Sequence, residues 1–434
     1  MTTSLLWFRR DLRLADHPAL CAAIASSDRV VPVFVLDPAL LEPAGANRVA
    51  FLLGALADLR RRTGGALRVV SGDPVEVIPG LAAGLGAVHV SSDHGPYGRA
   101  RDAAVAEQVD LVATGSPYGV TPGRLRKGDG SAYRVFTPFH KAWVSHGIRP
   151  PAAEPEQIPW YDGDLPTDEL PVAPTAVPLP EPTEAAARAH WQAFRERGLD
   201  RYAETRNGHE GTSRLSAYLR WGLLHPRTVH AGLGSSEGAQ AFGRELVWRD
   251  FYADVLWHQP HSARTDLADL PLEYDDPGPS FDAWRQGRTG FPYVDAGMRQ
   301  LLAEGWLPNR TRMVAASFLA KDLHVHWRHG ARHFLQHLVD GDLASNQHGW
   351  QWVAGTGTDA APYHRVFNPV LQGKAHDPDG DYVRRWVPEL RSVPDGSIHE
   401  PWALEHPPGG YPPRVVDHAR ERAEALHRFR GARG

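Results

Sequence analysis

Residues 305–352 gather side chains whose combined chemistry suits a bound heteroaromatic group. The segment holds Gly305-Trp-Leu-Pro-Asn-Arg-Thr-Arg-Met313, Asp340-Gly-Asp342, Asn346 and Trp350-Gln-Trp352. Carboxylates and an amide can address ring N–H groups, the Arg312 guanidinium can neutralise a developing negative charge, and the indoles can stack or carry electrons. Apart from the two carboxylates flanking Gly341, these residues are too scattered for a local surface cluster. They predict a site for a large planar cofactor.

The composition describes an ordinary globular protein with no strong bias toward one partner. At 434 residues the chain exceeds the usual size of a single core, so we expect two domains. The hydrophobic fraction of 42% and the charged fraction of 23% are typical of folded soluble proteins. The net charge of −4 argues against bulk attraction to nucleic acid, although a local basic face stays compatible with phosphate contact.

The sequence shows neither an export signal nor a membrane anchor. The first apolar run passes directly into Arg9-Arg10-Asp11, and no later run reaches the length of a membrane span. The single cysteine, Cys21, excludes an internal disulfide and favours a reducing compartment. We therefore expect a cytoplasmic monomer without membrane contact.

The first 130 residues alternate short apolar runs with amphipathic segments. Five runs have the length of strands: Leu5–Phe8, Val30–Leu36, Leu67–Ser71, Ala87–Ser91 and Asp110–Ala113. Helical periodicity follows the second and third runs, over Arg48–Arg61 and Pro74–Gly84. This alternation predicts a doubly wound α/β domain with a parallel sheet over residues 1–130. No Gly-x-Gly-x-x-Gly or Walker motif follows the first strand, so the usual dinucleotide and nucleoside triphosphate sites are not expected.

Residues 131–183 form the predicted connector, and residues 184–434 form the predicted all-α domain. Ten prolines between Pro150 and Pro182 leave no room for a regular helix, which indicates an extended linker over the surface. Helical periodicity then covers Thr183–Glu196, Ser216–Arg220, Gln240–Trp257, Val294–Glu304, Asn309–Asp322 and Ala331–Val339. Pro308 precedes Asn309, which we predict to be the N-cap of its helix.

Two further segments carry candidate chemistry. Gly211-Thr-Ser-Arg-Leu-Ser216 opens a predicted helix with hydroxyls, a guanidinium and free backbone N–H groups, which together suit a diphosphate. An ordinary N-cap would explain the same hydroxyls without a ligand. Residues 245, 248, 249 and 252, in Glu245-Leu-Val-Trp-Arg-Asp-Phe-Tyr252, share one helical face. The alternative for that face is an aromatic helix packed into the core with a solvated ion pair.

These motifs closely resemble the photolyase/cryptochrome family, in particular the class I cyclobutane pyrimidine dimer DNA photolyases. The resemblance runs from Leu6-Trp-Phe-Arg-Arg-Asp-Leu-Arg-Leu14 to Tyr411-Pro-Pro-Arg414 and is weakest between residues 120 and 185. It implies bound FAD, used as FADH⁻, and light-driven repair of cyclobutane dimers in damaged DNA. Photoexcited FADH⁻ would give an electron to a flipped-out dimer, and the electron would return after ring opening, without net redox change.

The resemblance carries FAD contacts onto a defined set of positions. We expect these residues at the cofactor: Tyr202, Thr212, Ser213, Arg214, Leu215, Ser216, Phe242, Arg249, Arg312, Asp340, Gly341, Asp342 and Asn346. Arg312 and Asp340 resemble the ion pair beside the isoalloxazine, and Asn346 is expected opposite flavin N5. A cation and an amide at these places would favour the reduced anion.

The resemblance also implies a substrate wall. Its expected members are Glu245, Trp248, Asn309, Met313 and Trp352. Glu245 would hydrogen-bond the flipped pyrimidines and Trp248 would stack on them. Asn309 and Met313 stand where (6-4) photolyases carry two histidines, which favours cyclobutane dimers as the substrate.

Trp350 and Trp327 match the two inner members of the electron-transfer chain that re-reduces the flavin in this family. The third member should be tryptophan, but Tyr274 stands there. A tyrosyl radical usually forms with proton loss, so terminal hole transfer would be slower or pH-dependent, or another nearby tryptophan would substitute.

Further positions match DNA and antenna contacts of the family. Arg206, Arg310, Arg365 and Gln372 match residues that contact the DNA backbone, which implies sequence-independent, salt-sensitive binding. Arg48, Asp93 and Arg220, with Pro96-Tyr-Gly-Arg99, fit relatives that hold an 8-hydroxy-5-deazaflavin antenna. Methenyltetrahydrofolate is the next choice, and an empty or FMN-filled crevice is the alternative.

Two other functions and a metal site fit the sequence less well than repair does. A cryptochrome-type light sensor would bind FAD without repairing DNA, but it predicts a missing substrate wall. A dark flavin oxidoreductase needs a nicotinamide site, and none is visible. His329, His333 and His337 share a helical face, yet no carboxylate–histidine or cysteine pattern completes a site, so no metal is expected.

Overall fold

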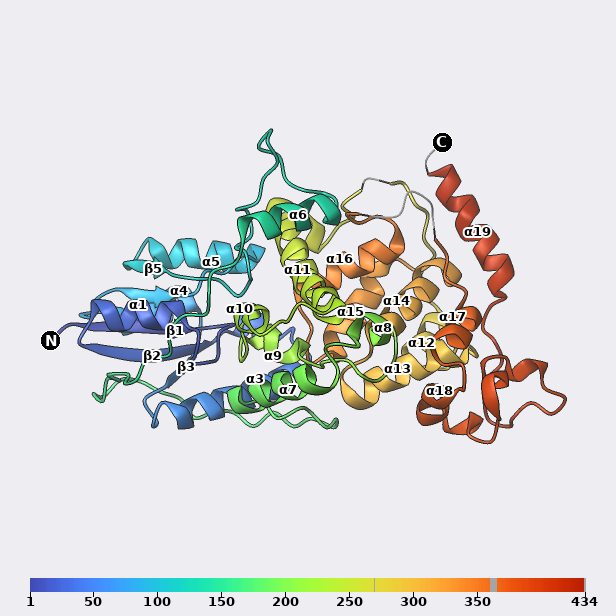
Figure 1. Cartoon of the computed structure of the whole chain (residues 1–434), viewed down its shortest axis with the longest axis horizontal. Helices are drawn as coiled ribbons and strands as arrows, with labels where there is room; N and C mark the ends of the chain where they lie inside the picture. Colours follow the sequence, from blue (N-terminus) through green and yellow to red (C-terminus); the bar gives the residue numbers. More distant parts are fainter. Residues whose placement is uncertain (269, 360–364, 433–434) are drawn as a thin grey trace. The chain divides into compact units, whose positions relative to one another are not determined.

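The computed structural model describes residues 1–268, 270–359 and 365–432, which fall into two compact units. Unit 1 comprises residues 1–175, 179–203 and 213–260, and unit 2 comprises residues 176–178, 204–212 and 261–434. Unit 1 holds the parallel sheet and its helices, whereas unit 2 is helical (Figure 1). The predicted fold class, an α/β doubly wound sheet followed by a helical region, is confirmed.

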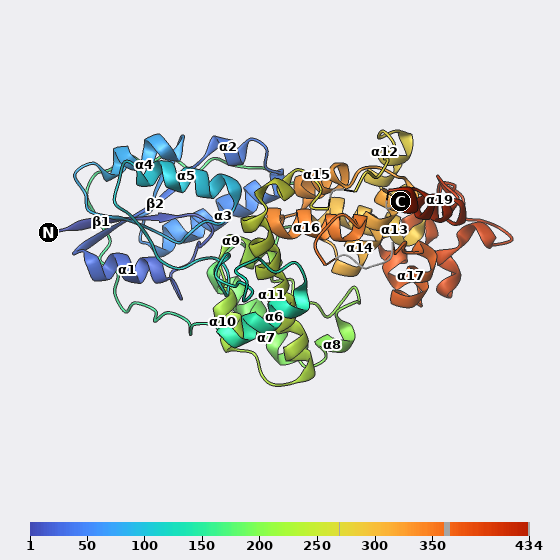
Figure 2. The ribbon, with the colours of Figure 1, turned by 90° about the horizontal axis from the view of Figure 1, so that it is seen from above.

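The sheet of unit 1 is parallel and five-stranded. Its strands are β1 (Thr3–Phe8), β2 (Arg29–Leu36), β3 (Arg68–Ser71), β4 (Val88–Val90) and β5 (Leu111–Ala113), in the order β3-β2-β1-β4-β5. All five apolar runs therefore became strands. Leu5 and Trp7 of β1 and Val31, Val33 and Val35 of β2 enter one core cluster, because alternate side chains of a strand point to the same face. Helices cover both faces, as parallel sheets require, with α1 on one side and α4 and α5 on the other (Figure 2).

The helices of unit 1 differ in how they begin: some start at a residue whose side chain caps the helix, and others have no side-chain cap. They are α1 (Pro18–Ser26), α2 (Pro38–Leu41), α3 (Ala46–Arg62), α4 (Pro74–Ala82), α5 (Pro96–Ala106), α6 (Phe136–His146), α7 (Glu184–Arg197), α9 (Ser216–Trp221), α10 (Pro226–Ala231) and α11 (Glu237–His258). Helix α8 (Tyr202–Thr205) runs from unit 1 into unit 2. The α11 helix starts earlier than predicted because the Ser236 side chain accepts a hydrogen bond from the backbone N–H of Ala239.

The predicted connector is only partly extended. Helix α6 occupies Phe136–His146, whereas residues 150–182 contain no helix, as the prolines predicted. The proline-rich segment binds the sheet domain: Tyr161 N–H donates to the Val30 carbonyl at 2.9 Å, and Asp168 N–H donates to the Val69 carbonyl at 2.6 Å. The compact units divide the chain differently from the predicted domains 1–130, 131–183 and 184–434, because helices α7, α9, α10 and α11 belong to unit 1. Those domain limits stay a prediction.

Unit 2 packs its helices around one large aromatic and aliphatic core. Its helices are η1 (Pro260–Ala263, shared with unit 1), α12 (Pro279–Arg285), α13 (Pro292–Glu304), α14 (Asn309–Ser317), η2 (Phe318–Asp322), α15 (Trp327–His337), α16 (Leu343–Ala354), α17 (Pro369–His376), α18 (Asp381–Trp386), η3 (Pro388–Leu390), η4 (Asp395–His399), η5 (Pro401–Ala403) and α19 (His418–Gly431). Trp284, Trp327, Phe334 and Trp350 all lie in that core. The predicted N-cap at Asn309 is wrong, because Pro308 holds the extended cap conformation and Asn309 is already the first helical residue.

The predicted helix Asn309–Asp322 changes to a π-helical turn at Phe318, and this turn buries Lys321. The Lys321 side chain is 4% exposed, and its Nζ donates to the Arg365 carbonyl at 2.6 Å. Burial lowers the pKa of Lys321 to about 7, although the neighbouring Asp322 acts to raise it. The unfolded chain keeps this proton up to a higher pH than the folded protein does.

The stability of the protein should therefore rise with pH between about 7 and 10.5 because of Lys321. The full shift corresponds to at most about 4–5 kcal/mol of unfolding free energy across that window. The Lys321→Met variant should lack this rise, since it has no proton to release, whereas Lys141→Met at an exposed site should keep it. Urea unfolding at a series of pH values measures the difference, and parallel profiles for wild type and Lys321→Met would contradict the prediction.

Candidate cofactor and substrate site

In unit 2, the predicted ion pair between Arg312 and Asp340 is formed. The Arg312 guanidinium donates through Nη2 to Asp340 Oδ2 at 2.8 Å, through Nη1 to Oδ1 at 3.3 Å, and through Nε to the Leu307 carbonyl at 2.9 Å. The Asp340 side chain is 3% exposed and that of Arg312 is 25% exposed. Three of the five guanidinium N–H groups are thus occupied, and the remaining two can face an anion.

The start of α16 and the two residues before it hold three further predicted flavin contacts: Gly341, Asp342 and Asn346. Helix α16 packs against α14 and α15 (Figures 1 and 2). Asp342 is the N-cap of α16 and accepts a hydrogen bond from the Ser345 N–H at 3.1 Å. One turn into α16, the Asn346 amide nitrogen donates to the Ala331 carbonyl of α15 at 3.1 Å and to Gln347 Oε1 at 2.9 Å. Because the side-chain amide is one planar group, these two donations also fix the direction of its carbonyl oxygen. Gly341, between the two aspartates, is buried.

Trp350 packs against α15 with very little free space. A Cβ at Gly330 would lie 2.2 Å from the Trp350 ring, so only glycine allows this approach. The Phe334 ring, one turn further along α15, contacts Trp350 edge-on at a centroid distance of 4.9 Å. The Trp284 ring also contacts Trp350, at 6.1 Å. Trp350 is 3% exposed and Trp327, at the start of α15, is fully buried, so both indoles are shielded from solvent.

The other two predicted electron carriers lie beside residues that the sequence did not single out. The Trp327 indole N–H donates to the Asp266 carboxylate at 2.5 Å, and His326 Nε2 lies 3.6 Å from the same carboxylate. The Tyr274 ring packs on the His326 ring at a centroid distance of 4.5 Å. Asp266 and His326 therefore belong to the surroundings of the predicted chain. An isolated aspartate 61 positions before its partner gives no sequence signal.

The predicted substrate residues of unit 2 keep some solvent access. Asn309 is exposed and Met313 partly exposed, and the Asn309 amide approaches the Met313 sulfur at 3.7 Å on one face of α14. Trp352 is partly exposed, and its indole N–H donates to the Asp359 carbonyl at 3.1 Å. The motif Gly357-Thr-Asp-Ala-Ala-Pro-Tyr363 that follows lies outside the described residues from position 360 onward.

In unit 1, the structure brings Tyr202 and Phe242 together, with their rings edge to face at 5.1 Å. Phe242 is 5% exposed and also contacts Phe194 at 4.9 Å. The hydroxyl-rich segment leads into α9, which begins at Ser216 as predicted, although Leu215 precedes it without a side-chain cap. Thr212, Ser213 and Arg214 form a loop, in which Arg214 adopts a left-handed φ of 48°.

The predicted substrate residues of unit 1 line up along α11. Glu245, Trp248 and the predicted flavin contact Arg249 are all partly exposed, so none is sealed in the core. The Trp248 ring stacks on Phe136 of α6, with centroids 3.8 Å apart and an interplanar angle of 5°. Phe136 is 6% exposed and is a residue that the sequence reasoning missed, because it lies 112 positions away in the predicted connector. The Arg249 guanidinium donates to the carbonyls of Pro117 at 2.7 Å and Leu219 at 3.2 Å.

The four predicted DNA contacts have different surroundings within unit 2. Arg206 and Arg365 are exposed, and the Arg365 guanidinium lies 4.8 Å from the Phe367 ring centroid. Arg310 is partly buried and donates to Asn207 Oδ1 at 2.8 Å. Gln372 is partly exposed and follows Leu371, which is 60% exposed.

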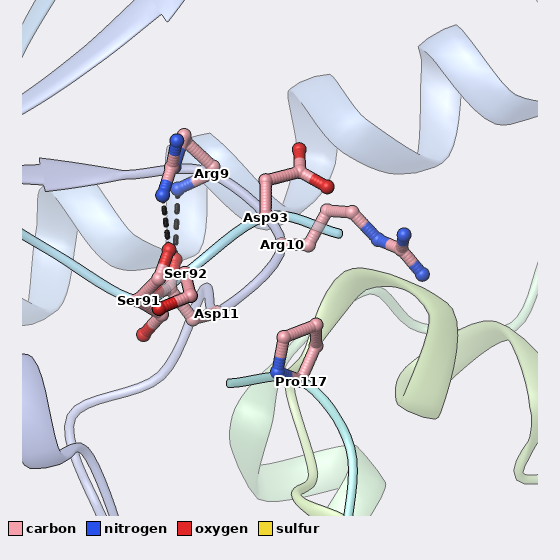
Figure 3. Close-up of a pocket in the computed structure, with 7 residues that line it drawn as sticks. All are labelled: Arg9, Arg10, Asp11, Ser91, Ser92, Asp93 and Pro117. Carbon is pink, nitrogen blue, oxygen red and sulfur yellow. Dashed lines mark hydrogen bonds between the residues drawn. The ribbon is translucent and has the colours of Figure 1, made fainter. Parts of the chain in front are cut away.

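A small polar hollow lies near the carboxyl ends of β1 and β4 (Figure 3). It is lined by Arg9, Arg10, Asp11, Ser91, Ser92, Asp93 and Pro117. Burial acts to raise the pKa of Asp93, but the nearby Arg9, Arg101 and Arg10 outweigh it and lower that pKa to about 2. Of the predicted antenna residues only Asp93 lines this hollow. Arg48 and Arg220 do not.

The glycine of the Pro96-Tyr-Gly-Arg99 motif has a clear packing reason. A Cβ at Gly98 would lie 2.2 Å from the Asp93 carboxyl group, so a larger residue would displace Asp93 from the hollow. Tyr97 donates its hydroxyl to Asp37 at 2.5 Å instead of entering the hollow. The motif therefore shapes the site through its backbone.

The histidines that invited a metal interpretation pack against aromatic rings. His333 lies 4.6 Å from His337 and 5.5 Å from Trp284, and His329 contacts Phe281, all as ring centroids. Within the described ranges, no group of three or more His, Cys, Asp or Glu side chains is arranged to hold a metal ion. Across the same residues, no helix combines the length and apolar character of a membrane span.

Comparison with known proteins gives a consistent result over the whole chain. Residues 4–156 match the DNA photolyase family, and residues 242–431 match the FAD binding domain of DNA photolyase. The deoxyribodipyrimidine photo-lyase of Halobacterium salinarum is 40% identical, with 99% of each chain aligned. The crystal structure of a bacterial class III photolyase from Agrobacterium tumefaciens superposes with a TM-score of 0.93 at 33% identity, covering 100% of this chain and 98% of that one. A Synechocystis sp. cryptochrome gives a TM-score of 0.91 at 28% identity, covering 99% of both chains.

The chain therefore belongs to the DNA photolyase family, and its C-terminal part is an FAD-binding domain. The prediction of a photolyase-type enzyme is confirmed. The class I assignment stays a prediction, since one of the similar structures is described as class III.

Proposed function

We propose that this protein binds FAD and uses light to split cyclobutane pyrimidine dimers in DNA. The observation that carries the proposal is the bidentate Arg312–Asp340 pair, formed inside a domain whose family binds FAD. When bound, the reduced flavin supplies the photoexcited electron for dimer splitting. The two N–H groups of Arg312 that have no acceptor among the described residues would stabilise a reduced, anionic flavin. Tyr202, Ser213–Ser216, Phe242 and Arg249 of unit 1 and Thr212, Gly341 and Asp342 of unit 2 complete the proposed FAD contacts.

The residues proposed to hold the flipped dimer are Glu245, Trp248, Asn309, Met313 and Trp352. The Glu245 carboxylate would accept hydrogen bonds from pyrimidine N–H groups, and the two partly exposed indoles would stack on the extruded bases. Arg206, Arg310, Arg365 and Gln372 would contact the DNA backbone without reading its sequence. Asn309 and Met313 contain no acidic proton for a (6-4) product, which favours the cyclobutane dimer and the class I assignment.

One assay separates repair from light sensing. Purified protein with chemically reduced flavin is mixed with an oligonucleotide that carries one thymine dimer, and intact thymines are counted with and without blue light. Light-dependent loss of the dimer is expected. An unchanged dimer level under illumination, with flavin bound, would instead favour a cryptochrome-type light sensor. The Synechocystis sp. cryptochrome has the same fold as this chain.

Phe136 should strengthen the substrate contact of Trp248. Because the Phe136 ring stacks on one face of Trp248, the indole is held in place, and a base would have to stack on its other face. Trp248→Ala should weaken binding of dimer-containing DNA by about 1–3 kcal/mol, the usual worth of a base–aromatic stack. Phe136→Ala should lose about half of that binding free energy. Phe136→Tyr should lose little, because a tyrosine ring can stack on Trp248 as the phenylalanine ring does. Fluorescence anisotropy with damaged and undamaged duplexes measures these losses.

Equal binding losses for damaged and undamaged DNA in the Trp248 variant would contradict this role. A suitable control is Trp257→Ala on the same helix, whose ring is covered by the guanidiniums of Arg99 and Arg126 and is not proposed to contact a base. That variant should bind both duplexes as the wild type does.

For the antenna, we propose that part of an 8-hydroxy-5-deazaflavin occupies the hollow beside Asp93. The enclosed space there is about 10 Å³, roughly the room for one water molecule, so only a polar edge of such a chromophore would reach into it. Reconstitution with 8-hydroxy-5-deazaflavin or methenyltetrahydrofolate, followed by absorption spectra, distinguishes the two chromophores.

A further inference from the structure

Asp266 lies where it can act on the predicted electron-transfer chain without being part of it. Its carboxylate accepts the Trp327 indole N–H at 2.5 Å and lies 3.6 Å from His326 Nε2. The Asp266 side chain is 21% exposed, while Trp327 is fully buried. A carboxylate is therefore directed at the most acidic proton of a buried indole.

Asp266 carries a negative charge at neutral pH. Its partial burial acts to raise its pKa, but hydrogen bonds from His326 and Trp327 outweigh burial and lower the pKa below its usual value. Loss of an electron would leave a positive charge on the Trp327 indole. An adjacent anion that is shielded from water stabilises such a charge far more than a neutral acceptor would.

Among the described residues, neither Tyr274 nor Trp284 donates a hydrogen bond to a carboxylate, although the Asp266 charge, after burial, also raises the pKa of the Tyr274 phenol. Tyr274 is largely buried, and among the described residues its hydroxyl has no hydrogen-bond partner to take the proton that a phenol releases on oxidation. The Trp284 indole, which contacts Trp350 at 6.1 Å, donates to the neutral Ala315 carbonyl at 3.0 Å. Of these three side chains, only Trp327 has a carboxylate on its N–H.

We propose that Asp266 is a positioning residue for photoreduction. Its effect is that Trp327, and not Tyr274, is the residue that stays oxidised at the end of electron transfer. The proposal deepens the proposed function and depends on its chain of Trp350 and Trp327. One electron passes from Trp327 to the oxidised Trp350. This transfer oxidises Trp327 and returns Trp350 to its neutral, reduced form. No covalent bond forms or breaks, and the indole proton stays in its hydrogen bond to Asp266. An external thiol or other one-electron reductant then returns an electron to Trp327.

The test uses Asp266→Asn, which keeps an oxygen acceptor for the indole N–H but removes the charge. The FAD-loaded, oxidised protein is excited by a laser flash, and the lifetime and spectrum of the tryptophan radical are recorded. We expect the radical lifetime and the rate of steady-state photoreduction to fall at least about tenfold, equivalent to about 1.4 kcal/mol. Tyr274→Phe should behave as wild type in both measurements. Asp275→Asn, which removes an exposed carboxylate near Tyr274, is the matched control and should also have no effect.

Wild-type radical lifetimes in Asp266→Asn, or loss of photoreduction in Tyr274→Phe, would overturn the proposal. Dimer splitting by chemically pre-reduced Asp266→Asn should equal that of the wild type, because repair does not use this chain. If wild-type protein photoreduces but never splits dimers, the proposed repair function fails while the role of Asp266 stands. If both proteins repair and photoreduce equally, the role of Asp266 fails while repair stands.

Discussion

Trp350→Phe should leave dimer splitting by pre-reduced protein intact but remove photoreduction of the oxidised flavin. The phenyl ring fills most of the space between Gly330 and Phe334, so the core of α15 and α16 should persist. A phenyl ring is not oxidised where an indole would be, so we expect the photoreduction rate to fall by at least about two orders of magnitude. Absorbance of the bound flavin during blue-light illumination with a thiol donor measures the rate.

The matched control is Trp284→Phe, because Trp284 is equally buried and contacts the same indole. It should photoreduce as the wild type does. If Trp284→Phe fails and Trp350→Phe does not, the hole leaves the flavin by another route and Trp350 is not in the pathway. Equal photoreduction in all three proteins would remove both tryptophans from it.

Arg312→Met should destabilise the protein strongly, because it leaves the Asp340 carboxylate buried without its cation. Asp340 is 3% exposed, and removing one partner of a buried ion pair typically costs about 3–5 kcal/mol. Since Arg312 itself is 25% exposed, water can partly replace its guanidinium beside Asp340. We therefore expect a destabilisation at the lower end of that range, about 3 kcal/mol. The shift in the urea midpoint of the FAD-free protein measures this cost.

A second variant separates stability from flavin chemistry. Arg312→Met combined with Asp340→Asn removes both charges and should recover most of the lost stability. If Arg312 also stabilises a reduced, anionic flavin, the double variant should still bind the reduced cofactor weakly. Arg285→Met is the control for a generic arginine: its ion pair with Asp282 is exposed on both sides and should contribute less than about 1 kcal/mol. A destabilisation of Arg285→Met as large as that of Arg312→Met would refute the argument from burial.

The secondary structure was largely accessible from the sequence because its signals are local. The apolar runs at Leu5–Phe8 and Val30–Leu36 became the two central strands within a residue or two of their predicted limits. The predicted helix starts were wrong where a capping residue sets the first turn. Ser236 caps α11 earlier than predicted, and Pro308 takes the cap position predicted for Asn309. A cap depends on the conformation of one residue, which periodicity does not specify.

The candidate site was predictable only where a motif carried it. The resemblance named Arg312 and Asp340 in advance, and the structure joins them. It also named Tyr202 and Phe242, which contact each other in unit 1. Of the three predicted antenna residues, only Asp93 lines the hollow. Its other charged lining residues, Arg9, Arg10 and Asp11, follow the end of β1.

By itself, the sequence determined the parallel sheet, the helical C-terminal part and the family, since each follows from short-range periodicity or from contiguous motifs. Only the tertiary structure decided that Phe136 supports Trp248, that Asp266 binds the Trp327 indole and that Lys321 is buried in a π-helical turn. Phe136 and Asp266 lie 112 and 61 positions from their partners. Such pairings depend on how distant segments pack, and the free energy of packing is not encoded in the spacing of residues along the chain.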